Sequence, residues 1–125
     1  MAIILVVDDD QNLRELLTDI LSNNGYKVQA AQDGRAALDA LKKSRFDLVI
    51  LDMHMPNVNG IDVLKVMRVS PATRKLPVLM CTSETLIREV EAAYQAGADG
   101  YVVKPYSAAK LLDKVAETLK KAAGG

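Results

Sequence analysis

Apolar residues along this chain form two kinds of pattern that alternate from one end to the other. Four short runs are continuously apolar and rich in β-branched residues, as in strands covered on both faces: residues 3–7, 48–51, 77–80 and 101–103. A weaker run over residues 26–30 alternates apolar and polar positions, which is typical of an edge strand. The pattern therefore predicts five strands.

Between these runs, apolar residues recur at the three- and four-residue spacing that places them on one face of a helix. Five sets have this spacing: Leu13, Leu16, Leu17, Ile20 and Leu21; Ala37, Leu38 and Leu41; Ile61, Leu64 and Met67; Ile87, Val90 and Tyr94; and Leu111, Leu112, Val115 and Leu119. Residues able to cap helices flank several sets, with Asp10, Asp33 and Ser107 at the starts and Gly25 and Gly97 at the ends.

Strands that alternate with helices predict an α/β fold with a five-stranded parallel sheet. Right-handed crossovers then place helices on both faces, which gives a doubly wound, three-layer α/β/α sandwich. The 125 residues suit one domain. We expect it to span residues 1–121, followed by an Ala-Ala-Gly-Gly tail, residues 122–125, that frays.

Composition argues against several classes of function. Sixteen basic and 16 acidic residues balance to zero net charge, and aromatic residues are few and include no tryptophan, so we expect no direct contact with nucleic acid. The single cysteine excludes an intramolecular disulfide and favours a reducing, cytoplasmic compartment. No apolar run approaches the roughly 18 residues of a membrane span. We expect a cytoplasmic monomer without a membrane partner.

Charge is nevertheless distributed unevenly along the chain. Residues 1–62 hold 10 acids and six bases, whereas residues 63–125 hold six acids and 10 bases. Four of the bases follow one another with no acid between them: Lys65, Arg68, Arg74 and Lys75. We expect these side chains to cover a solvated helix end and loop.

Polar residues that can carry chemistry follow four of the predicted strands. They are Asp8, Asp9 and Asp10 after the first strand, Asp52 after the third, Thr82, Ser83 and Glu84 after the fourth, and Lys104 and Pro105 after the fifth. In doubly wound sheets the working site lies at the carboxyl ends of the strands. We therefore expect these four strand ends to converge.

Several carboxylates in one small site repel one another, and a divalent cation removes that conflict. Mg²⁺ takes oxygen ligands and is often held by one or two carboxylates together with phosphate oxygens. Lys104 adds a mobile positive charge, and Thr82 adds a hydroxyl donor. The set indicates phosphoryl chemistry in which an aspartate such as Asp52 acts as a covalent acceptor.

Some of these residues have simpler interpretations. Asp10 is placed to cap the following helix, and Cys81 fits a small buried hydrophobe. His54 is the only histidine, which argues against a histidine-based metal centre and suits an exposed loop. Asp52 differs, because a carboxylate at the end of a buried strand is costly without partners. The methionines indicate packing: Met53, Met55, Met67 and Met80.

In this order and at these strand ends, the residues resemble the receiver domain of bacterial response regulators over essentially the whole chain. The matching pattern is a hydrophobic strand before Asp8-Asp9, Asp52 followed by Met55-Pro56 and Gly60, then Thr82, and finally Lys104-Pro105. Residues 96–105 look most like the stand-alone members that act in chemotaxis. The resemblance implies the flavodoxin-like strand order 2-1-3-4-5.

The resemblance also implies roles at the strand ends. Asp52 would be the phosphoacceptor, and Lys104 would contact the phosphoryl group. Asp8 and Asp9 would hold Mg²⁺ together with Asp52 and the backbone carbonyl of His54. A sensor histidine kinase or phosphotransfer protein would supply the phosphoryl group, so the domain would be a switch that assists its own phosphorylation rather than an enzyme.

Further residues would couple that event to an output surface. Thr82 would move toward the phosphoryl group and let Tyr101 turn from exposed to buried. Lys104-Pro105 would be a cis peptide, which an X-Pro bond permits. The fourth helix, fifth strand and fifth helix, with Tyr101 and Tyr106, would bind a protein target. His54 and Glu84 would tune the lifetime of the phosphoryl group.

Sequence leaves alternative uses open. The domain can switch a protein target, or it can be a phosphorelay shuttle that passes the phosphoryl group to a histidine phosphotransfer protein. A phosphorylation-independent interaction module would be expected to lose Asp52, a member of the acidic pair or Lys104. A flavodoxin-like cofactor binder would need a Ser/Thr/Gly-rich loop where Asp8-Asp9-Asp10 stands. An aspartate-based phosphatase would carry a second Asp where His54 stands.

Overall fold

The computed structural model describes residues 1–83, 87–104 and 107–124, and within them it contains the five strands and five helices that the sequence predicts. The strands are β1 (Ile3–Val7), β2 (Lys27–Ala31), β3 (Leu48–Asp52), β4 (Val78–Thr82) and β5 (Gly100–Val103). The helices are α1 (Gln11–Ser22), α2 (Gly34–Lys43), α3 (Gly60–Val69), α4 (Ile87–Gln95) and α5 (Ala108–Gly124). None of the described helices combines the length and the apolar character needed to cross a bilayer.

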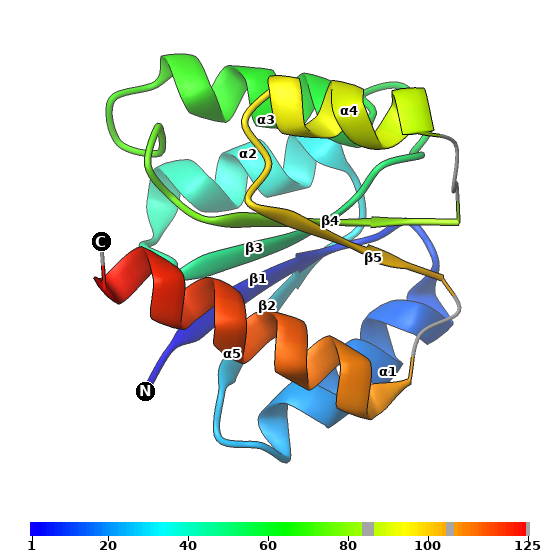
Figure 1. The fold of residues 1–125 in the computed structure, drawn as a ribbon, viewed down its shortest axis with the longest axis vertical. Coiled ribbons are helices and arrows are strands. Elements are labelled where there is room, and N and C mark those ends of the chain that lie inside the picture. The colour runs from blue at the N-terminus through cyan, green and yellow to red at the C-terminus, as the bar shows by residue number, and fades with distance from the viewer. Residues whose placement is uncertain (84–86, 105–106, 125) are drawn as a thin grey trace.

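The strands are all parallel and form one sheet in the order β2-β1-β3-β4-β5. Helices α2, α3 and α4 lie on one face of the sheet and α1 and α5 on the other, which gives three layers (Figure 1). The predicted doubly wound sandwich and the implied strand order are both confirmed. The strand order reverses between β1 and β3, so their carboxyl ends form the switch point where such folds bind ligands.

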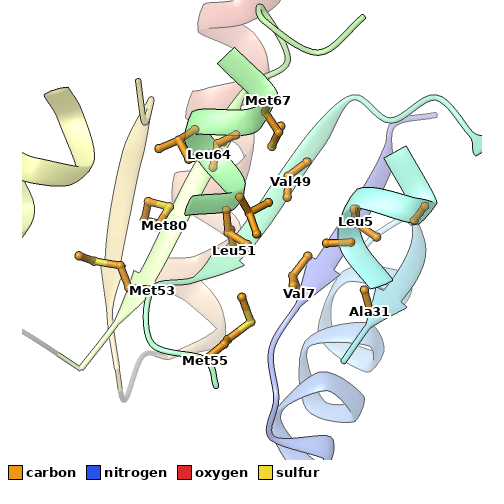
Figure 2. Close-up of a cluster of buried hydrophobic side chains, with 14 of the residues drawn as sticks. Leu5, Val7, Ala31, Val49, Leu51, Met53, Met55, Leu64, Met67 and Met80 are labelled. Carbon is orange, nitrogen blue, oxygen red and sulfur yellow. The ribbon is translucent and has the colours of Figure 1, made fainter. Parts of the chain in front are cut away.

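Each face of the sheet has its own hydrophobic core, because successive strand residues point to opposite faces. Leu5, Val49 and Met80 belong to the core beneath α2 and α3 (Figure 2). Ile4 and Ile50, one position away on the same strands, belong to the core beneath α1 and α5. The inner strands β3 and β4 are buried along their whole length, whereas β2 is mostly exposed, as predicted for an edge strand.

Local signals in the sequence mark the helix boundaries correctly. Asp10 and Asp33 accept hydrogen bonds from backbone N–H groups in the first turns of α1 and α2, and the Ser107 hydroxyl does the same at the start of α5. Gly25 and Gly97, which follow α1 and α4, have φ angles of 90° and 108°. Glycine adopts this left-handed region without strain, so the chain can turn directly after each helix.

Packing interpretations of single residues are also confirmed. Cys81 is 1% exposed, and the four methionines assigned to packing are buried in the core beneath α2 and α3: Met53, Met55, Met67 and Met80. Met53 and Met55 lie beyond the end of β3, whereas Met67 lies on α3 nearer Val49, toward the other end of the strand (Figure 2).

Helix α4 forms where it was predicted but turns a different face to the sheet. Ile87 and Tyr94, expected on its buried face, are 75% and 47% exposed, while Ala93 is buried. The helix approaches the sheet through a small side chain, so its larger apolar residues fall beside the contact. The prediction of its buried face was therefore wrong, although its position was right.

One expectation about a charged residue was wrong. Arg68, predicted to be solvated, has a side chain that is only 18% exposed and donates hydrogen bonds to the carbonyls of Thr73, Leu76 and Gly97. Helix α5 includes residues 122–124. Alanine has the highest helix propensity, which suits the two alanines at this end of the helix.

Candidate functional site

The register of the parallel sheet brings the predicted strand-end residues to one edge. The last residues of β1 pair with β3, so Asp8 follows β1 beside Asp52, the last residue of β3. Thr82 ends β4 and pairs with the residue before Lys104 on β5. The carboxyl ends of the four strands therefore converge, as predicted.

Lys104 connects the two buried carboxylates. Its Nζ lies 2.9 Å from Asp8 Oδ2 and 3.3 Å from Asp52 Oδ1. Asp8 is 2% exposed and Asp52 4% exposed, so neither carboxylate is well hydrated. The backbone N–H of Lys104 donates to the carbonyl of Thr82 at 2.7 Å, which fixes the start of the Lys104 side chain beside β4.

Burial dominates the protonation of Asp52. Burial, followed by the charge of Asp8, raises the pKa of Asp52 from 3.8 to about 6, against the opposing effects of Lys104 and of the His54 N–H. Burial lowers the pKa of Lys104, but the hydrogen bond to Asp8 and the charges of Asp52 and Asp8 outweigh it, so the pKa is raised. Lys104 therefore stays charged, while Asp52 loses its proton only as the pH rises past about 6.

Three acidic side chains form a group that suits a hard cation. One carboxylate oxygen from each of Asp8, Asp9 and Asp52 lies within 4.8 Å of the others, with Asp9 exposed and the other two buried. Fully ionised, three carboxylates beside the single Lys104 ammonium leave an excess of two negative charges. Carboxylate oxygens are the ligands that Mg²⁺ prefers. The donor set and its charge therefore fit a divalent cation such as Mg²⁺.

Asp8 is held in place by the cap and the first turn of α1. Its Oδ1 accepts a hydrogen bond from the backbone N–H of Asp10 at 2.9 Å, and its backbone carbonyl accepts one from Arg14 Nη1 at 2.7 Å. Sequence reasoning did not single out Arg14. The available signal is its position four residues after Asp10, because helical side chains lean toward the helix N-terminus and so toward the end of β1.

The start of α3 packs directly against the backbone of Asp52. A Cβ added at Gly60 would lie 2.2 Å from the Asp52 carbonyl oxygen and 2.9 Å from the Cα of Met53. The Gly60 N–H donates to the Met53 carbonyl at 3.0 Å, and Asn59 caps the helix through its side chain. Gly60 belongs to the sequence pattern described above, but the reason for glycine there is this close approach.

Tyr101 lies on β5 next to α4. It is half-buried, and its ring meets that of Tyr94 edge to face, with centroids 6.0 Å apart and an interplanar angle of 83°. Edge-to-face pairs of this kind are favourable beyond their buried area. Tyr101 is thus held between α4 and the sheet, at the face expected to contact a target.

The remaining predicted residues fall into two groups. His54 is exposed, as expected, and its backbone N–H donates to Asp52 Oδ1 at 3.3 Å. Glu84, Pro105 and Tyr106 lie outside the described residues.

Comparison with known sequences supports the resemblance. The sequence pattern of the response regulator receiver domain matches residues 4–116. Chemotaxis protein CheY-3 of Vibrio cholerae is 44% identical over 120 residues, which cover 93% of this chain and 92% of that protein. The response regulator MprA of Mycolicibacterium vanbaalenii is 42% identical over 118 residues, or 94% of this chain and 50% of that protein.

Solved structures agree. Chemotaxis protein CheY4 of Vibrio cholerae superimposes with a TM-score of 0.91 at 36% identity, covering 94% of this chain and 98% of that one. A CheY-like receiver domain protein from Methanospirillum hungatei superimposes with a TM-score of 0.92 at 27% identity, covering 99% of this chain and 98% of that one. The chain therefore belongs to the response regulator receiver domains of two-component signalling.

Proposed function

We propose that this receiver domain works as a switch by accepting a phosphoryl group on Asp52. Receiver domains interact with histidine kinases and with downstream targets. The observation that carries the proposal for this chain is the position of Asp52. Its carboxylate is buried at the switch point of the sheet, beside a second carboxylate and bonded by Lys104.

The transfer needs a nucleophile and a means of spreading charge. A carboxylate oxygen of Asp52 attacks the phosphorus of a phosphohistidine or of a small acyl phosphate. The bond from phosphorus to the imidazole nitrogen or acyl oxygen of the donor breaks, and the leaving group takes the bonding electrons. Lys104 Nζ, 3.3 Å from Asp52 Oδ1, stabilises the negative charge on the phosphoryl oxygens.

Hydrolysis then removes the phosphoryl group from Asp52. Water attacks the phosphorus of the acyl phosphate, inorganic phosphate leaves, and Asp52 returns to a carboxylate. His54 stands exposed two residues after Asp52, and Glu84 stands two residues after Thr82 in the sequence. We propose that these two side chains set how fast water removes the phosphoryl group.

Mg²⁺ fits the acidic group as its cofactor, held by Asp8, Asp9, Asp52 and the backbone carbonyl of His54. When bound, it supplies positive charge that neutralises the carboxylates and the phosphoryl oxygens. The hydrogen bond from Arg14 to the backbone carbonyl of Asp8 fixes that backbone and so keeps the Asp8 carboxylate turned toward Lys104.

Coupling to the output surface uses Thr82 and Tyr101. A phosphoryl group adds charge and acceptor oxygens, which draw the Lys104 ammonium and the Thr82 hydroxyl toward it. Movement of Thr82 gives Tyr101 room to turn inward from its contact with Tyr94. The surface of α4, β5 and α5 would then bind a protein target differently in the two states, which is the condition for a shift in population.

Intact mass measured after incubation with Mg²⁺ and acetyl phosphate tests this function. We expect one added phosphoryl group on the wild type, none on Asp52→Asn, and none when EDTA removes the cation. Asp113→Asn, which removes an exposed carboxylate from α5, is the matched control and should be modified like the wild type. The decay of the adduct in His54→Ala and Glu84→Ala reports on the lifetime proposal, which unchanged rates in both variants would contradict.

Beryllium fluoride serves as a stable phosphoryl mimic if acetyl phosphate fails as a donor. An adduct that persists in Asp52→Asn would place the acceptor elsewhere. Absence of both the adduct and beryllium fluoride binding in the wild type would leave the domain working through its surface, without phosphorylation.

A further inference from the structure

A groove crosses the molecule at the amino end of the sheet, opposite Asp52. Its first part is a hollow of about 360 Å³ between α2 and α3, lined mainly by apolar side chains. Its second part, of about 560 Å³, lies between the end of α2 and residues 70–76 and is lined in part by Phe46 and Leu76. Leu41, Ala72 and Thr73 line both parts, so the two hollows adjoin each other. We call this the α2–α3 groove.

The α2–α3 groove is positively charged. Lys42 lines its first part, and Arg45, Arg74 and Lys75 line its second part, whereas none of the acidic side chains that the structure describes lines either. All four basic side chains are exposed, and none of them enters an ion pair with another residue in the described part of the chain. The chain as a whole has no net charge, so the groove is a local concentration of positive charge.

Apolar surface accompanies this charge. Val66, which lines the groove, is 45% exposed, and Val69 at the end of α3 is 82% exposed. The hollow on the α4-β5-α5 surface is different, because it is lined by acidic as well as basic residues: Lys110, Asp113, Lys114 and Glu117. An occupant that matches the α2–α3 groove must be negatively charged and must carry apolar side chains.

We propose that the α2–α3 groove docks an acidic segment of a partner protein, which inserts one or two large apolar side chains between α2 and α3. Segments of this kind commonly bind in grooves through apolar anchors. The surface is concave and extends across two hollows, which suits a peptide better than a membrane, where apolar side chains must project outward. Charged side chains at the rim would steer the segment and fix its direction.

The groove and the acidic site can act independently. Phe46 and Leu76 precede β3 and β4, whereas Asp52 and Thr82 end them, so about 17 Å of strand separates the two ends. A partner held in the α2–α3 groove therefore leaves both the acidic site and the α4-β5-α5 surface accessible. The domain can be tethered by one protein while it switches another.

Selection of random 12-residue peptides against the full chain tests the proposal. We expect the selected peptides to be enriched in Asp and Glu together with Leu, Ile or Phe. Arg45→Glu/Arg74→Glu should weaken their binding by about tenfold or more, because both changes reverse charges at the groove. Lys110→Glu/Lys114→Glu makes the same charge change on α5 and should leave binding within about twofold.

Thermal stability and modification by acetyl phosphate separate a loss of peptide binding from a loss of folding. All variants should keep the thermal midpoint of the wild type and its modification by acetyl phosphate, and Arg45→Gln/Arg74→Gln replaces the reversal if that variant is unstable. Selected peptides without acidic enrichment, equal binding by the two double variants, or no saturable peptide would each overturn the proposal. Phosphatidylserine vesicles that bind while no peptide does would assign the groove to a membrane, which also overturns it.

Discussion

Asp52 is the residue at which folding and the proposed chemistry oppose each other. Its carboxylate is 4% exposed and stands beside Asp8, and burial raises its pKa to about 6. Ionised Asp52 therefore costs the native state free energy, because water solvates the same carboxylate well in the unfolded chain. Buried charges of this kind are expected at functional sites, and the acidic group around Asp52 fits a cation that would offset the cost.

The free energy of unfolding should reflect this cost. In EDTA, Asp52 takes up its proton at about pH 6 in the native state and near its ordinary pKa of 3.8 in the unfolded state. Between these values the native state binds more protons, so its stability falls as pH rises through this range. Asp52→Asn has no carboxyl group at this position to titrate, so its stability does not fall for this reason. We expect the variant to match the wild type near pH 4 and to exceed it by about 1–2 kcal/mol above pH 6.

Urea unfolding at several pH values between 4 and 7.5 measures the difference. Asp113→Asn, which changes an exposed carboxylate, should follow the wild type throughout. An advantage of Asp52→Asn that is the same at pH 4 and pH 7 would show that the cost arises from something other than the charge.

At the scale of elements, the junction of β3 and α3 is the tightest contact near the site. Gly60 leaves no room for a side chain, because the Asp52 carbonyl and the Met53 backbone occupy that space. Helix α3 can therefore begin directly beneath Asp52, with Asn59 as its cap. The position of the Asp52 carboxylate therefore depends on this contact.

Gly60→Ala should separate α3 from the end of β3. A methyl group 2.2 Å from a backbone oxygen forces the backbone to shift, so we expect a loss of about 2–4 kcal/mol in the free energy of unfolding. Modification of Asp52 by acetyl phosphate should slow as well. Gly124→Ala, at a helical glycine with open space around it, should change stability by less than about 0.5 kcal/mol. Equal effects of the two substitutions would contradict this account.

Elements were the most predictable part of the structure. Continuous apolar runs and caps such as Asp10 and Asp33 are local signals, and the elements they predicted are present. The buried face of α4 was not predictable in this way. Its spacing admits the face that contains Ile87 and Tyr94, and the contact of Ala93 with the sheet depends on how closely α4 approaches.

At the scale of the molecule, Arg68 joins α3 to the residues just before β4 and to the residues between α4 and β5. From α3 its guanidinium reaches Thr73 and Leu76 before β4, the carbonyl of Gly97 after α4, and the carboxylate of Asp99 at 3.2 Å. These bonds hold the amino ends of β4 and β5 to the helical layer. They lie at the end of the sheet away from Asp52.

Removal of Arg68 should weaken the whole fold without touching the acidic site. Arg68→Ala leaves several carbonyls without their donor, so we expect a loss of about 2–4 kcal/mol in the free energy of unfolding. Arg68→Lys should recover only part of it, because one ammonium cannot reach all of those acceptors. Urea unfolding provides the measurement, and Arg88→Ala, at an exposed position on α4, should be nearly neutral. Identical stabilities of Arg68→Ala and Arg88→Ala would contradict a structural role.

The whole-molecule arrangement was predictable only as far as topology determines it. Parallel strands bring their carboxyl ends together, so the meeting of Asp8, Asp52 and Lys104 followed from the element order alone. The inward turn of Arg68 and the hydrogen bond from Arg14 to Asp8 could not be predicted from the element order. An arginine in a sequence is expected to be solvated unless the carbonyl groups around it are known.

The burial of Cys81 has a practical consequence for measuring motion. It is the only cysteine in the sequence, it is 1% exposed, and it pairs with Asp52 in the sheet. Its side chain belongs to the core beneath α1 and α5, so an alkylating reagent can reach the thiol only when that core opens. The rate at which the native protein is alkylated therefore reports on opening of the core behind the strand end next to Asp52, without any engineered label.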